Sequence, residues 1–227
     1  MKKKILVLLL ILVIISAGIA AYILLRDEKL VVSNKNIDSK ETSKTIPEAK
    51  TPDGNWVIEN TEDVFVGYQI NEVFGGETVS KSAVGKTNNV TSTLTVDGLT
   101  MSNISVEADM TRLKSDEPRR DSKLRTEALE TDKFPIATFV QTGELTFSEA
   151  PVKGKSIEVA VDGDLTLHGV TRATTISLIV FWDGKVIKVS GEKEIFLKDF
   201  DITPPDSSFV KTEDKGILKI QLLLIPA

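Results

Sequence analysis

The sequence of 227 residues contains no cysteine and a single histidine, His168. The lack of cysteine excludes a disulfide bridge, a thiolate nucleophile, a cysteine-ligated zinc site and a lipid anchor on an N-terminal cysteine. One histidine excludes a metal site built from several histidines. Carboxylates alone could still bind calcium or magnesium, but no loop of the DxDxDG type is present. We therefore expect no metal and no cofactor.

Motifs of covalent and phosphate chemistry are also missing. There is no GxSxG, no second histidine and no phosphate-cradling glycine loop. The carboxylates Asp116, Glu117, Asp121 and Asp201 show no spacing that selects a pair for glycoside hydrolysis. A net charge of −5 with interspersed signs argues against nucleic-acid binding. We expect a protein that is not an enzyme, and a hydrolase acting at a membrane surface is the least favoured alternative.

One long apolar run is present, at the N-terminus. Residues 5–25 carry no charge and follow three lysines, and at about 1.5 Å per residue they can cross a membrane core of about 30 Å. Because lysines favour the cytoplasmic side, we predict a single-pass anchor over residues 1–25, with the N-terminus cytoplasmic and the rest extracytoplasmic. A cleaved signal peptide ending at Gly18-Ile19-Ala20 is the alternative, which would make the protein secreted. Residues 26–53 are polar, lack aromatics and are predicted to be a flexible linker.

From residue 54 to 227 apolar and polar residues alternate, which is typical of strands with one buried face. Asp97-Gly98 and Asp183-Gly184 are predicted hairpin turns, because glycine supplies the positive φ that tight turns need. The pattern predicts an all-β fold, an antiparallel barrel or sandwich. The expected strands are 56–58, 64–70, 90–96, 104–110, 138–147, 157–167, 174–182, 186–189, 194–200 and 217–225.

The inward-facing positions of these strands are mostly aliphatic. Two interiors fit this pattern: side chains that interlock into a solid core, which composition alone favours, or a wide barrel with an elongated apolar cavity. If a cavity exists, the residues expected to contact an apolar ligand are Val66, Tyr68, Ile70, Leu94, Val96, Ile104, Val106, Phe139, Val161, Leu165, Leu167, Ile176, Leu178, Val180, Ile220 and Leu222.

A short helix is predicted between two strands, over Ser122 to Thr131, with Asp121 as its N-cap and Pro135 ending it. Its apolar face carries Leu124, Ala128 and Leu129. A single helix in a β-rich chain is typical of a lid or plug over one end of a barrel; the alternative is a crossover helix that only packs.

Two polar sites are candidates for recognition. Arg119 and Arg120 precede the predicted helix and could hold a phosphate or carboxylate head group, although a capping and salt-bridge role is favoured. His168, before Gly169 at a predicted strand end, suggests a turn, where a lone histidine more often forms structural hydrogen bonds than acts in catalysis.

Four motifs resemble the YceI-like family, the polyisoprenoid-binding, lipocalin-like barrels of bacteria. Gly163 to Arg172 (GDLTLHGVTR) resembles the family's "GxLTihGvTk" hairpin and is the most specific match. The RDSKL and KFPIATF runs within 120–139 resemble its helix segment. FLKDFDI at 196–202, together with 214–218, resembles its ending, and GNWVI at 54–58 its start. Departures are Lys123 in place of histidine, Lys198 in place of arginine, Asp201 in place of glycine and an unusual second strand at 67–72, which resembles a membrane-anchored branch of the family.

The resemblance implies a lipocalin-like antiparallel barrel of about eight strands with one short helix, and it shifts the expectation from a solid core to a cavity. It implies an apolar lipid-like partner, a polyisoprenoid or fatty-acid derivative, held inside the barrel. Arg120, Asp121, His168 and Arg172 are then the polar candidates at one barrel end. The alternative is a cell-envelope interaction scaffold with a filled barrel and no ligand.

Overall fold

The computed structural model describes residues 46–75, 80–204 and 210–227. Within them the chain forms strands, three short 3₁₀ or π turns and one short α-helix. The elements are β1 (Gly54–Ile58), β2 (Phe65–Phe74), β3 (Ser80–Thr87), β4 (Val90–Asp97), β5 (Thr100–Asp109), η1 (Met110–Arg112), β6 (Lys114–Ser115), α2 (Pro118–Lys123), η2 (Leu124–Ala128), β7 (Ile136–Gln141), β8 (Leu145–Thr146), β9 (Ser156–Leu167), β10 (Val170–Trp182), β11 (Ile187–Phe196), η3 (Leu197–Phe200) and β12 (Val210–Pro226).

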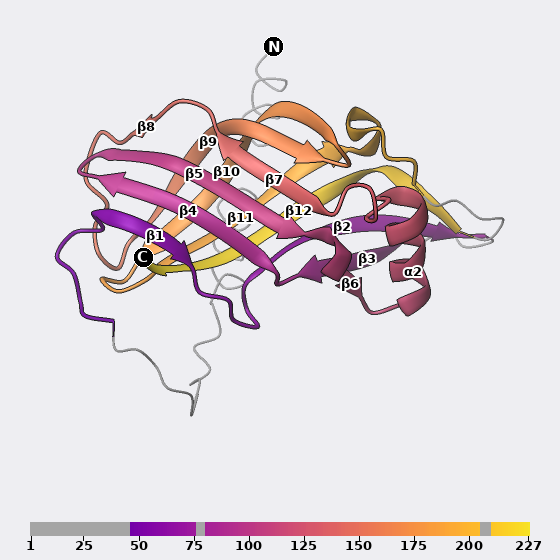
Figure 1. Cartoon of the computed structure of the whole chain (residues 1–227), viewed down its shortest axis with the longest axis horizontal. Helices are drawn as coiled ribbons and strands as arrows, with labels where there is room; N and C mark the ends of the chain where they lie inside the picture. Colours follow the sequence, from indigo (N-terminus) through magenta and orange to yellow (C-terminus); the bar gives the residue numbers. More distant parts are fainter. Residues whose placement is uncertain (1–45, 76–79, 205–209) are drawn as a thin grey trace, which may run out of the picture. The chain divides into compact units, whose positions relative to one another are not determined.

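The strands form a closed antiparallel barrel of eight strands, the fold that the resemblance to the YceI-like family implies. Its order is β1-β4-β5-β7-β9-β10-β11-β12, and pairing of β1 with β12 closes the ring. β2 and β3 extend the barrel beyond β1 and β4, because the long β12 pairs first with β2 and then with β1. Figure 1 shows α2 at one end beside β3 and β6, and β1 with the C-terminus toward the other. We call these the helix end and the turn end.

The turn end is made by tight hairpins at the two predicted positions. Gly98 joins β4 to β5 with φ of 57°, and Gly184 lies between β10 and β11 with φ of 98°. Inward side chains of β4, β9 and β10 are fully or nearly buried, among them Val90, Val161 and Ile176. The period-two pattern therefore identified the buried face of these strands correctly.

The helix differs from its predicted start. α2 begins four residues earlier, at Pro118, whose missing amide hydrogen costs nothing at the first helical position. Glu117 is the N-cap, and its carboxylate accepts from the Arg119 amide at 3.0 Å. Asp121 as N-cap is wrong: it lies inside the helix and is bound by Ser115. After Lys123 the helix continues as the π turn η2, in which the Leu129 amide donates to the Leu124 carbonyl at 2.7 Å.

Several strand predictions also need correction. The predicted strand 138–147 is two strands, β7 and β8. β3 was not predicted, because its inward residues Ala83, Gly85 and Thr87 are too small to give an apolar alternation. The predicted strands 186–189 and 194–200 are one strand, β11, followed by the 3₁₀ turn η3. β12 begins seven residues before the predicted 217, which provides the extra length that pairs with β2.

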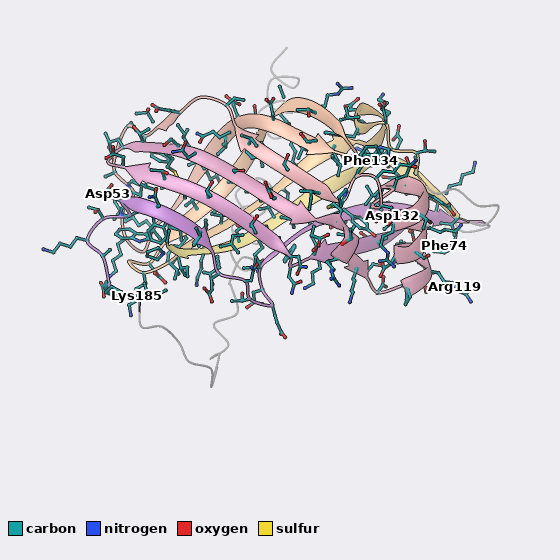
Figure 2. All side chains as sticks on the ribbon, in the orientation of Figure 1. Asp53, Phe74, Arg119, Asp132, Phe134 and Lys185 are labelled. Atoms are coloured by element: carbon teal, nitrogen blue, oxygen red, sulfur yellow. The ribbon has the colours of Figure 1, made fainter. Side chains whose placement is uncertain are left out.

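Residues 46–53, which precede β1, lie at the turn end. The Ala49 amide donates to the Gly184 carbonyl at 2.7 Å, and the Trp56 indole donates to the Pro52 carbonyl at 2.8 Å. In Figure 2, Asp53 and Lys185 lie at this end, opposite Phe74 and Arg119. The last residues of the predicted linker thus contact the barrel. The predicted anchor over residues 1–25 lies outside the described residues, and within those residues no helix is long and apolar enough to span a membrane.

Candidate functional site

The barrel interior is not filled. It contains an apolar cavity of about 190 Å³, which extends along the barrel from Leu224 on β12, toward the turn end, to Thr212 and Arg120 at the helix end. Of the two interiors compatible with the sequence, the structure therefore has the cavity. All the apolar residues predicted to contact a ligand line it, except Val96. Their role in binding stays a prediction.

Val96 instead lies at the turn end, in a separate space of about 20 Å³ that it shares with Trp182 and Pro52. Trp56 and Trp182 are both buried near this end of the barrel. The two indoles and the Pro52 segment pack the turn end tightly, so the larger space lies toward the helix end.

The helical segment forms part of the cavity wall. Leu124, Ala128 and Leu129, the predicted apolar face, all line the cavity. β6 pairs with β3, and the described residues place no second strand on its other side. α2 and η2 lie beside β6 in place of a strand. The segment therefore forms part of the cavity boundary at the helix end.

Arg120 lies at the helix end of the cavity, and four of its five N–H groups donate to protein groups. Its Nε and Nη2 donate to the two carboxylate oxygens of Glu72 at 2.8 and 3.0 Å. Its Nη1 donates to Asp116 at 2.6 Å and to the Ser115 hydroxyl at 3.2 Å. These bonds, first the one to Glu72, raise the pKa of Arg120 further above its usual range. The structure thus shows the salt-bridge role for Arg120.

Asp121 is buried but does not line the cavity. Its Oδ1 accepts from the Ser115 amide at 2.8 Å and from the Ser115 hydroxyl at 2.7 Å. It therefore fixes α2 to β6, which is a positioning role.

Tyr68 points into the same end of the cavity from β2. Its ring occupies the space over Gly85 on β3, where a Cβ would come within 2.3 Å of the ring. Its hydroxyl is buried and has no hydrogen-bond partner in the described part of the chain. Burial raises the pKa of Tyr68. The positive charge of Arg120 lowers this pKa, and the negative charges of Asp121, Glu72 and Asp116 raise it further. The phenol therefore stays protonated at physiological pH.

The model of the YceI-like domain matches residues 56–224 of this chain, which is nearly the whole barrel. The chain belongs to the YceI-like family.

Relatives agree with this assignment at the level of sequence and fold. Protein YceI of Shigella flexneri and that of Escherichia coli O157:H7 are each 34% identical to it over 106 residues, 44% of this chain. The chain spans about half the length of the curated relatives it matches. A polyisoprenoid binding domain from Saccharophagus degradans, implicated in plant cell wall breakdown, matches with a TM-score of 0.57 at 13% identity, over 76% of this chain and 98% of that one. BcnA of Burkholderia cenocepacia matches with a TM-score of 0.51 at 18% identity, over 69% of this chain and 95% of that one.

The YceI-like hairpin residues His168 and Arg172 do not reach the cavity. The His168 Nδ1 lies 3.1 Å from the Phe200 carbonyl, and its Nε2 lies 3.2 Å from a Glu130 carboxylate oxygen. The Phe134 ring meets the imidazole edge-on at 4.6 Å between centroids. Lys133 first, and then His168, lower the pKa of Glu130. The predicted structural role of the lone histidine agrees with this geometry.

Arg172 and Asp201 organise η3, the other YceI-like feature of the helix end. The Arg172 Nε donates to the Asp199 carbonyl at 2.8 Å. Asp201 has φ of 52°, a left-handed conformation that aspartate tolerates better than most residues. It therefore occupies the position where the family motif has glycine, in a conformation that glycine also adopts readily.

Sequence reasoning missed several residues of the site. Glu72 was not predicted as a site residue, because its ion-pair partner Arg120 is 48 positions away in the sequence. Ser92 lines the cavity from β4, and its hydroxyl is buried without a partner among the described residues. Its place two residues before Leu94, at the period of the strand, was the available signal. Within the residues that the structure describes, no cluster of His, Asp and Glu could hold a metal ion.

An apolar interior of this kind, in a chain of the YceI-like family, supports binding of an apolar ligand in general. The YceI-like family is one of binding proteins.

Proposed function

We propose that this protein holds one long apolar chain, a polyisoprenoid or a fatty-acid derivative, inside its barrel. The observation that carries the proposal is the cavity itself, because its lining residues form a continuous apolar surface. A dry apolar cavity of about 150 Å³ is enough to bind benzene, so about 190 Å³ admits part of a hydrocarbon chain. Each buried methylene contributes about 0.8 kcal/mol.

The experiment uses the full chain. Lipids that co-purify with it are extracted with organic solvent and identified by mass spectrometry, and the stripped protein is titrated with the uncharged dye Nile red. We expect an apolar lipid in the extract and saturable dye fluorescence that added prenols abolish. An empty extract together with no saturable dye binding would contradict the proposal.

We further propose that the barrel works outside the cytoplasm, held at the membrane by residues 1–25. The support is the uncharged run after three lysines and the polar residues that follow it. Protease added to spheroplasts should degrade the barrel while a cytoplasmic marker survives. Protection of the barrel equal to that of the marker would exclude this location. Recovery of the barrel in the soluble fraction would indicate the cleaved, secreted alternative.

A further inference from the structure

The cavity offers a ligand no free positive charge. Among the described residues that line it, Glu72 and Arg120 are the only charged ones. They are joined by two parallel hydrogen bonds, and Asp116 accepts a third strong bond from the same guanidinium. Both side chains of the lining pair are largely buried, at 18% exposed for Arg120 and 11% for Glu72. One cation is thus shared by two carboxylates before any ligand arrives.

The surroundings of this pair do not add a cation to the cavity. Asp121 lies one residue further along the helix and is also buried. Lys81 stands opposite Glu72 on β3, but it is exposed, does not line the cavity and has its Nζ 4.8 Å from the centroid of the Phe74 ring. Arg125, which donates to the Leu113 carbonyl at 3.3 Å, does not line the cavity either.

The unpaired polar atoms of the cavity are neutral. Tyr68 and Ser92 line it, and their hydroxyls are buried and have no partner in the described part of the chain. A hydroxyl can donate and accept, so it matches an alcohol, an amide or a ketone equally well. A buried polar group without a partner costs free energy, which a ligand with such a head group would recover.

We propose that the ligand of this barrel carries an uncharged head group, a hydroxyl or a carbonyl, and that diphosphates and ionised fatty acids are excluded. An anionic head group would be desolvated beside Glu72 and Asp116 with no cation left to compensate it. This inference rests on the proposed function and narrows it to neutral lipids.

The test compares matched ligands on the full chain, by displacement of Nile red near neutral pH. Geranylgeraniol is paired with geranylgeranyl diphosphate, and hexadecanol with palmitate. We expect the neutral member of each pair to bind about tenfold tighter or more, the effect of a like charge at short range. Equal or tighter binding of the charged members would overturn the inference and leave the proposed function intact. If no member displaces the dye, the proposed function itself fails.

Variants test the cause. Glu72→Gln removes the carboxylate that occupies Arg120, and we expect it to raise the affinity for the diphosphate about tenfold. Asp116→Asn, whose side chain is 84% exposed, is the second variant and carries little risk to folding. Glu158→Gln, on the outer face of β9, is the matched control and should change nothing. Unchanged diphosphate affinity in both Glu72→Gln and Asp116→Asn would rule out this explanation.

A last variant tests the head-group contact. Tyr68→Phe should weaken geranylgeraniol about fivefold, the loss of one hydrogen bond, and leave squalene, which has no head group, unchanged. Equal loss for both ligands would show that the hydroxyl makes no contact with the head group.

Discussion

The buried hydroxyl of Tyr68 makes the stability of the protein depend on alkaline pH. Its pKa in the folded protein is raised above the usual 10.0, so the unfolded chain loses this proton first as the pH rises. The unfolded state then binds fewer protons than the folded state, and stability falls above pH 10. We expect Tyr68→Phe to remove this part of the loss, seen as a flatter dependence of the urea midpoint on pH above about pH 10. Parallel curves would contradict it.

His168 combines a backbone role with a side-chain role in one turn. It and Gly169 join β9 to β10 with φ of 52° and 74°, the paired positive values of a tight hairpin. Asparagine tolerates this conformation and alanine does not. We expect His168→Asn to cost about 1 kcal/mol, from the lost contacts with Phe200 and Phe134, and His168→Ala about 1 kcal/mol more. Chemical denaturation measures the free energy of unfolding of both variants. Equal losses in His168→Asn and His168→Ala would mean that the turn conformation is not strained.

At the scale of elements, the ion pair of Arg120 and Glu72 connects α2 to β2. Glu72 is 8% exposed, so Arg120→Met leaves a buried carboxylate without a partner and should cost about 3–5 kcal/mol in the free energy of unfolding. The double variant Glu72→Leu/Arg120→Met should recover most of that loss, since an apolar pair of similar volume often replaces a buried ion pair. Additive losses in the double-mutant cycle would show that the two charges do not depend on each other.

The elements also show how far the sequence could be interpreted. Strands with large alternating residues, such as β4 and β9, were predicted because their apolar face is visible locally. β3 was missed because Gly85 is small in order to make room for the ring of Tyr68, a contact between strands. The helix start was misplaced although a local signal was present, because proline favours the first helical position and Glu117 precedes Pro118 as the N-cap.

At the scale of the molecule, the cavity should respond to filling. Ser92 lines it and has a buried hydroxyl without a partner in the described residues. Ser92→Leu should therefore stabilise the protein by about 1 kcal/mol and reduce Nile red capacity, because the new side chain occupies the ligand's space. Thr91→Leu, on the outer face of the same strand, is the control. Thermal unfolding and dye titration measure both variants, and equal dye capacity in the two would contradict the assignment of the cavity as the binding site.

The cavity itself could not be derived from periodicity. Alternation shows which side chains point inward, but the space left between them depends on the circumference of the ring and on how the opposite walls face each other. The resemblance to the YceI-like family suggested a hollow interior, and the structure shows one. The charge balance at its helix end depends on Glu72 and Asp116 meeting Arg120, which only the folded chain reveals.

The wall beside β6 has a consequence for how a lipid tail reaches the interior. There α2 and η2 are attached to their neighbours by side chains, through Arg120 and Asp121 toward one side and through Glu130 and Phe134 to His168 on the other. Moving this stretch outward breaks no interstrand ladder, although it separates the ion pair of Arg120 and Glu72, so we expect it to open more readily than the paired strands. Deuterium uptake in η2 should therefore outpace uptake in β9 and β10 and should slow once the interior is occupied.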